Sequence, residues 1–455
     1  MIRATGWTGW KAACLLFAAG TLAGGIPVLG AQTSLQSSSQ ASSQAGALDS
    51  RFFTPQPKKA PWLLDWGVEA TAAAVSEGQG LPDNLVVGGS GQAWARLSLP
   101  GLWQFYGRAK DNILIPLVPW PAAGFQYLNF WEINAAYLQY VQGEGGVTLG
   151  IGRKFFLLGS GLILAGNGDG LELQLANPWF NAKAFGYYTG FQGKDFSTYA
   201  MHDWDRENGP RRYFGGYSFG VSVFGQDLAL LGMYQSDFRM GPKDLYTSWY
   251  SGFQAKGLVL GGEYLAEWYQ EKGFSPSGAG RDTIDAYAGI ARYTRAFRSA
   301  AAPRLTVQYA LASGDGDRTI GKGAPGNTKG QDLAFQAFGQ VRSGSVFRPS
   351  FSNIHIAHLG FVFNPLGGAP RRFKGTSIGL GYFYYAKHDA AGVVNTEDAK
   401  AANRDLGHGL DLNVQFSLFN DSSLFVNGGV FFPGAAFSGE RTLRYSLSGG
   451  LSFSL

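Results

Sequence analysis

The chain has 455 residues and a formal net charge of +5, with 67 glycines, one cysteine, 15% aromatic residues and only 15% charged residues. So many aromatic residues exclude intrinsic disorder, and a single cysteine excludes a disulfide scaffold. Beyond the first thirty or so residues, no apolar run reaches the ~18 residues that a membrane-spanning helix needs. The composition favours an all-β chain whose apolar faces meet either one another or lipid.

The N-terminal segment predicts export from the cytoplasm. Arg3 and Lys11 precede or border a small, apolar stretch at 12–23, and small residues at 28–31 offer a cleavage site. We expect residues 1–31 to be removed as a signal peptide, and Cys14 and two positive charges are lost with this segment. The net positive charge of the remaining chain is too small to indicate nucleic acid as a partner. Residues 32–60 form a Ser/Gln-rich flexible leader, and residues 61–455 form one domain.

From about residue 63 onward, apolar and polar residues alternate with a period of two, which predicts strands. The last strand is the clearest, because apolar residues from Leu443 to Leu455 alternate with serine and glycine over about thirteen residues. A soluble sandwich strand is usually ~5–6 residues long, whereas a tilted membrane strand needs ~9–11. We predict eighteen strands, at 63–75, 92–99, 102–115, 129–142, 147–156, 170–176, 180–191, 213–225, 228–237, 245–256, 258–271, 282–295, 304–313, 352–364, 375–386, 407–419, 423–432 and 441–455.

The predicted connections alternate between short and long. The long ones fall at 76–91, 116–128, 157–169, 192–212, 237–244, 271–281, 313–351, 386–406 and 433–440. Membrane barrels have tight periplasmic turns and longer outer loops, and a sheet in lipid must close because an open edge would leave backbone groups unpaired. Tryptophan and tyrosine gather near predicted strand ends, as in aromatic girdles.

The sequence therefore predicts a single antiparallel transmembrane β-barrel of about eighteen strands in the outer membrane. An even strand count places both termini in the periplasm. Residues 443–455 would serve as the signal for the barrel-assembly machinery, although the chain ends on Leu455 and its nearest aromatic residue is Phe453.

Signals for catalysis, metals and cofactors are weak. The chain has five histidines, and His355 and His358 face opposite sides of a strand. The sequences at 166–170 and 313–317 are rich in Asp and Gly, but they lack the complete calcium-loop spacing and are typical of turns. We expect no enzyme activity, no cofactor and no metal.

Charged residues on the polar faces of strands would point into the lumen if the apolar faces meet lipid. The basic candidates gather on the early strands, whereas Glu263 and Glu267 lie on a strand near the opposite wall. Charges of opposite sign on facing walls would orient polar solutes. The candidate pore-lining residues are Arg96, Arg108, Lys110, Glu132, Arg153, Lys154, Lys183, Glu263, Glu267 and Arg295.

Two segments resemble the alginate-export-type porins. The first runs from Gly150 to Lys154 and continues through Gly159, Gly161, the apolar residues 162–164 and the Asp-Gly-Leu at 169–171, and the second is the Tyr-Ala-Leu-Ala-Ser-Gly-Asp at 309–315. The resemblance implies an eighteen-stranded outer-membrane barrel that passes anionic polysaccharide or small organic solutes through a lumen lined by Arg and Lys. It also implies that Arg153 lies in the pore.

Strict alternation instead places Arg153 on the lipid face with Leu149 and Ile151. A bulge at Gly152 would reconcile the two interpretations; without it, Arg153 would be an interface anchor.

We favour a passive channel or exporter for polar, anionic solutes or saccharides. The alternatives are a hydrophobic-compound transporter of the fatty-acid-channel type and a surface adhesin with a blocked lumen.

Overall fold

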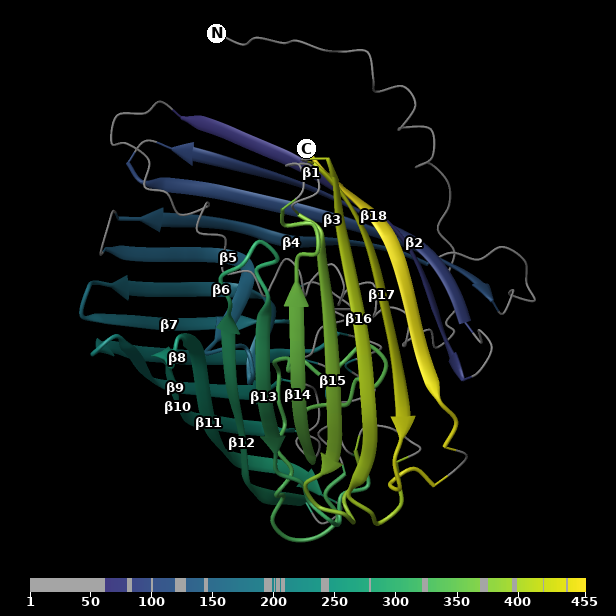
Figure 1. Ribbon diagram of the computed structural model, residues 1–455. Helices are drawn as coiled ribbons and strands as arrows, with labels where there is room; N and C mark the ends of the chain where they lie inside the picture. Colours follow the sequence, from purple (N-terminus) through teal and green to yellow (C-terminus); the bar gives the residue numbers. More distant parts are fainter. Residues whose placement is uncertain are drawn as a thin grey trace.

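The protein forms one closed barrel of eighteen antiparallel strands (Figure 1). The computed structural model describes residues 62–79, 84–99, 101–118, 128–142, 146–191, 199, 201, 205, 209–238, 245–277, 280–320, 326–368, 375–394, 399–419, 421–438 and 441–455. The expected signal peptide at 1–31 and leader at 32–60 lie outside these ranges. Within them, no helix is long and apolar enough to cross a membrane.

Each strand pairs with its neighbours in sequence, and β1 also pairs with β18 to close the wall. The strands are β1 (Leu63–Gln79), β2 (Asn84–Leu99), β3 (Trp103–Val118), β4 (Leu128–Val141), β5 (Val147–Leu158), β6 (Leu164–Ala176), β7 (Phe180–Tyr188), β8 (Arg212–Val223), β9 (Gln226–Asp237), β10 (Thr247–Val259), β11 (Gly262–Ser277), β12 (Gly280–Ala296), β13 (Arg304–Ala312), β14 (Ile354–Phe363), β15 (Ser377–Lys387), β16 (Asp405–Phe419), β17 (Ser422–Pro433) and β18 (Arg444–Ser454).

The predicted fold class is confirmed, and all eighteen predicted strands are present. The strict alternation of long and short connections is wrong at three places, because the connections at 80–83, 159–163 and 278–279 are as short as turns. The strands on either side are longer than predicted there. Backbone pairing does not require apolar side chains, so the glycine-rich stretches 84–91 and 164–170 continue the ladder without an alternating pattern.

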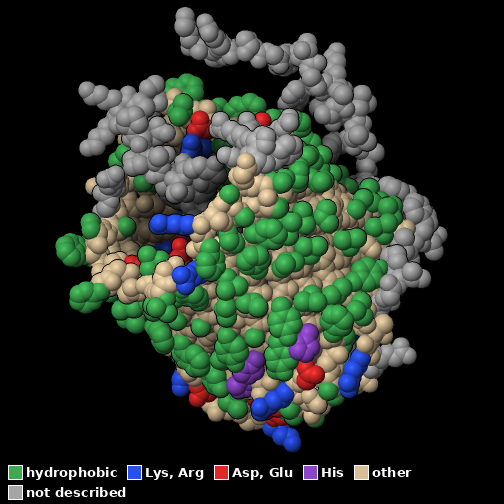
Figure 2. Space-filling model, in the orientation of Figure 1, with side chains coloured by type: hydrophobic (Ala, Val, Ile, Leu, Met, Phe, Trp, Pro, Cys, Tyr) green, Lys and Arg blue, Asp and Glu red, His purple; other side chains and the backbone are tan. Residues whose placement is uncertain are grey.

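The two faces of the wall differ in chemistry. Outward-pointing side chains include Trp66, Trp131 and Leu171, which are 67%, 67% and 51% exposed, whereas serines of β18 such as Ser446 and Ser448 are buried on the inner face. Figure 2 shows hydrophobic side chains spread over the outer wall, with charged side chains in the opening and along the lower edge. An apolar exterior around a polar interior is the arrangement that lipid imposes on a membrane barrel.

Candidate lumen and constriction

The predicted basic residues of the early strands point inward, and several are already neutralised. Arg96 lies opposite Asp65 on β1 and forms an ion pair with it at 2.5 Å. Lys154 on β5 contacts Glu172 on β6 at 2.6 Å, and Lys183 on β7 approaches the same carboxylate at 3.9 Å. Lys183 also donates to the backbone oxygen of Leu157 at 2.5 Å. These three cations are therefore held to the wall by named partners.

Arg108 and Lys110 differ from their neighbours. Both lie on the inner face of β3, and neither forms an ion pair with any residue in the described part of the chain. Lys110 lies opposite Glu132 in the register, but Glu132 accepts its hydrogen bond from Asn134 at 3.0 Å. The Nε of Arg108 has no hydrogen-bond partner among the described residues. Lys110 is only 8% exposed and the carboxylate of Glu132 acts on it electrostatically, so Arg108 is the predicted basic residue left to attract an anion.

Arg153 is buried, although strict alternation along β5 would place it on the same face as the lipid-facing residues of that strand. The pairing of β5 shows no register shift, so the bulge considered at Gly152 is absent, but Gly152 has a φ of +126°. Arg153 forms an ion pair with Asp169 at 2.8 Å and donates to the backbone oxygen of Ile133 at 2.7 Å. This carbonyl adjoins a bulge in β4, where the pairing with β3 passes over Asn134. Arg153 therefore ties three strands together and is not a free charge.

The predicted acidic wall is not formed. Glu263 is exposed beside the turn between β10 and β11. Glu267 is only 3% exposed and accepts hydrogen bonds from the backbone N and the Oγ of Ser160, both at 2.6 Å. It therefore fixes the β5–β6 connection and does not face open lumen.

Arg295 points outward, contrary to the prediction. It lies opposite Leu305, in line with the lipid-facing Val307, and its guanidinium stacks over Phe297 at 5.3 Å. Arg292, three residues earlier and on the opposite face of β12, is the arginine that points inward.

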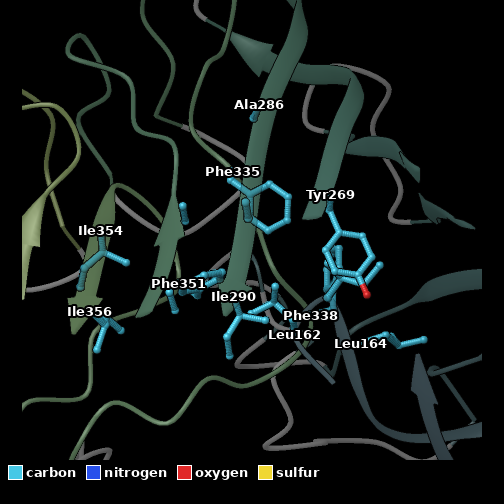
Figure 3. Close-up of a cluster of buried hydrophobic side chains, with 14 of the residues drawn as sticks. Leu162, Leu164, Tyr269, Ala286, Ile290, Phe335, Phe338, Phe351, Ile354 and Ile356 are labelled. Carbon is cyan, nitrogen blue, oxygen red and sulfur yellow. The ribbon is translucent and has the colours of Figure 1, made fainter. Parts of the chain in front are cut away.

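The long connection between β13 and β14 folds into the barrel, which the sequence did not settle. Its residues Phe335 and Phe338 are fully buried in one apolar cluster with Leu164 of β6, Tyr269 of β11 and Ala286 of β12 (Figure 3). The backbone of this connection pairs with the β5–β6 connection, since Phe338 donates to Ile163 at 3.0 Å and Gln340 donates to Gly161 at 2.9 Å. We call residues 331–353 the inner segment.

Polar contacts hold the inner segment at widely separated points of the wall. The backbone N of Gln336 donates to Glu271 of β11 at 2.8 Å, and Tyr250 of β10 donates to the backbone oxygen of Gln336 at 2.8 Å. Ser345 donates to Asp411 of β16 at 2.6 Å, and Arg348 contacts Glu77 of β1 at 3.4 Å. The inner segment therefore narrows the lumen together with residues 159–163.

Two buried ionic groups support these loops. Arg318 forms an ion pair with Asp332 at 2.9 Å, and both side chains are almost completely buried. Arg212 contacts Asp205 at 2.9 Å and Asp237 at 3.2 Å, with no exposed surface on any of the three side chains.

Tyr246, just before β10, donates to Glu271 at 2.5 Å, and burial together with that carboxylate keeps the pKa of its hydroxyl well above the usual value. Tyr246 therefore remains a hydrogen-bond donor.

These features define the class of the molecule as an outer-membrane, porin-type β-barrel. The family model described as "Alginate export" matches residues 249–446 and confirms the resemblance seen in the sequence.

Solved outer-membrane porins share the fold. The structure of Pseudomonas aeruginosa OccK2 (OpdF) is 14% identical with a TM-score of 0.57, covering 87% of this chain and 99% of its own. Acinetobacter baumannii OccAB2 is 10% identical with a TM-score of 0.57, covering 86% of this chain and 98% of its own. A further OccK2 structure, 14% identical with a TM-score of 0.54 and covering 87% and 99%, is a complex with glucuronate. No curated protein sequence matches the chain.

Proposed function

We propose that the barrel is a passive channel for small, polar solutes that carry a carboxylate, sugar acids among them. The observation that carries the proposal is Arg108, a cation without a carboxylate partner among the described residues, on the inner wall of a barrel narrowed by its own inner segment. A cation without a carboxylate partner can exchange its hydration for contact with a passing anion, and then release it. The glucuronate bound by a porin of the same fold is a solute of this class.

The predicted pore residues that are paired with carboxylates have a different role under this proposal: they shape the lumen and steer solutes. Asp65 balances the charge of Arg96, but Lys154 and Lys183 share the one carboxylate of Glu172, so the three cations, held close to the wall, keep a net positive charge. They shape the lumen and steer anions toward Arg108 on β3.

The orientation follows from the same proposal. The beginning of β1 and the end of β18 lie at the rim of the barrel that carries most of the short turns, and we assign that rim to the periplasm. The strand over residues 443–455 would then be the part that the barrel-assembly machinery recognises.

Ion selectivity tests the proposal. In a planar bilayer with a salt gradient, the reversal potential of the refolded chain should have the sign that indicates a preference for anions. Arg108→Glu should move that potential toward cation preference, whereas Arg295→Glu, on the outer face, should leave it unchanged. A cation-selective wild-type channel, or equal shifts in both variants, would refute the assignment of the solute class.

A further inference from the structure

The inner face of β13 and β14 carries buried polar groups that lack partners. His358 and Gln308 lie opposite each other in the register, and each is only 3% exposed. Both ring nitrogens of His358 and the Nε2 of Gln308 have no hydrogen-bond partner among the described residues. Leaving a buried polar group without a partner costs ~1–3 kcal/mol, so such a group points to an occupant that supplies one.

Beside His358, the inner wall has no side chains at two adjacent positions. Gly360 and Gly381 are paired across β14 and β15, and neither has a positive φ that would require glycine. A Cβ on Gly381 would lie 3.7 Å from the Nε2 of His358 and 3.5 Å from the Cβ of Asp411. The His358 ring covers Gly360, since a Cβ there would lie 2.9 Å from the ring, so of the two glycines it is Gly381 that leaves bare backbone between His358 and Asp411.

Charged groups surround this bare backbone. Asp411 lies opposite Gly381 and uses Oδ1 for Ser345, whereas its Oδ2 has no donor among the described residues. Arg342, on the inner segment, acts electrostatically on His358, Asp411 and Arg292, and it forms no ion pair within the described ranges. Arg292 lies opposite Gln308 on the inner face of β12.

We infer that these residues form a second solute site, which binds one sugar-acid unit between the inner segment and the wall. Arg342 and Arg292 bind the carboxylate, Asp411 accepts a hydrogen bond from a hydroxyl group, and His358 and Gln308 bind further hydroxyl groups. The mixture of two cations and one carboxylate fits a solute that has both an anion and hydroxyl donors. Gly381 lets a hydroxyl group of the sugar approach the backbone. The inference rests on the proposed function, and it adds a site on the wall away from β3.

Single-channel recordings of the refolded chain, with glucuronate added, test the site. Gly381→Ala fills the bare backbone, and its new Cβ meets the Phe383 ring at 3.1 Å, a contact that a small ring movement relieves. Gly379→Ala is the matched control on the same face of β15, since its nearest contact is 3.6 Å. We expect glucuronate blocks to be about tenfold shorter in Gly381→Ala and His358→Leu, and unchanged in Gly379→Ala. Arg342→Gln should shorten glucuronate blocks without changing glucose blocks.

The outcomes separate the two proposals. An anion-preferring channel whose glucuronate blocks last equally long in wild type, Gly381→Ala and His358→Leu overturns the second site and leaves the proposed function intact. A silent or cation-selective wild-type barrel overturns the proposed function, and the second site with it. Blocks that shorten in the Gly379→Ala control as much as in Gly381→Ala also overturn the site.

Discussion

Breaking the Arg318–Asp332 ion pair should release the inner segment from the wall. Arg318 Nη1 donates to both carboxylate oxygens of Asp332, at 3.1 and 2.9 Å, and both side chains are almost completely buried. The backbone of Asp332 also pairs with β12, since its N donates to Thr283 at 2.8 Å and its oxygen accepts from Asp285 at 3.0 Å. Arg318→Met would therefore leave an uncompensated carboxylate where the segment joins the wall.

Removing one partner of a buried ion pair typically costs about 3–5 kcal/mol. If the segment avoids that cost by detaching, its detached population should rise by about 100- to 4,000-fold. Trypsin can cleave after Lys329 and Arg342, and cleavage of a briefly opened segment follows the population of the open form. We expect cleavage at these sites to accelerate by about two orders of magnitude or more in the folded barrel, with larger and noisier single-channel currents.

The double variant Arg318→Met with Asp332→Asn is the control, because it removes both charges and keeps the shape of the acidic side chain. Replacing both partners of a buried pair is often close to neutral, so protection should return largely to the wild-type level. Equal protection of the single variant and the wild type would refute the reasoning that this ion pair holds the inner segment.

Glu267→Gln should loosen residues 159–163, because a neutral amide accepts hydrogen bonds from the N and Oγ of Ser160 more weakly than a carboxylate does. We expect more frequent fluctuations of the single-channel current. Glu263→Gln, at the exposed rim, is the control and should leave the current unchanged. Leu171→Lys, on the outer face near the middle of β6, should destabilise the folded barrel by about 2–4 kcal/mol in lipid, measured by urea unfolding, whereas Leu171→Ile should have a small effect. His388, in the loop after β15, has a pKa below its usual value because of burial and the nearby Arg404. The folded barrel therefore favours the neutral ring, and the stability that this contributes above pH ~6.5 is lost as the pH falls and the ring becomes protonated. His388→Gln should therefore flatten the stability profile between pH 7 and 5, and an unchanged profile would contradict this assignment.

The sequence predicts the wall of the barrel well, because lipid imposes a pattern that single residues display. Alternation places β18 and β16 within a few residues of their observed bounds, and it correctly places His355 and His358 on opposite faces of one strand. It fails at 84–91 and 164–169, where glycines let the ladder continue without any apolar pattern.

The lumen is less predictable, because its chemistry depends on contacts between residues far apart in the chain. Glu267 is an inward-facing carboxylate by pattern, but its partner Ser160 lies 107 residues away. Arg342 belongs to a connection whose inward path depends on the burial of Phe335 and Phe338. Arg295 was placed on the wrong face by a shift of one residue in β12, and the same shift hid Arg292. A run of aromatic residues inside a long connection was the available signal that this connection is buried.

The most direct test of the channel itself is the conductance of single, refolded barrels of residues 32–455 in a planar bilayer. We expect stepwise insertion of open channels that carry more anion than cation current. Barrels that insert and fold, as shown by heat-modifiable migration on gels, but pass no current would contradict this expectation.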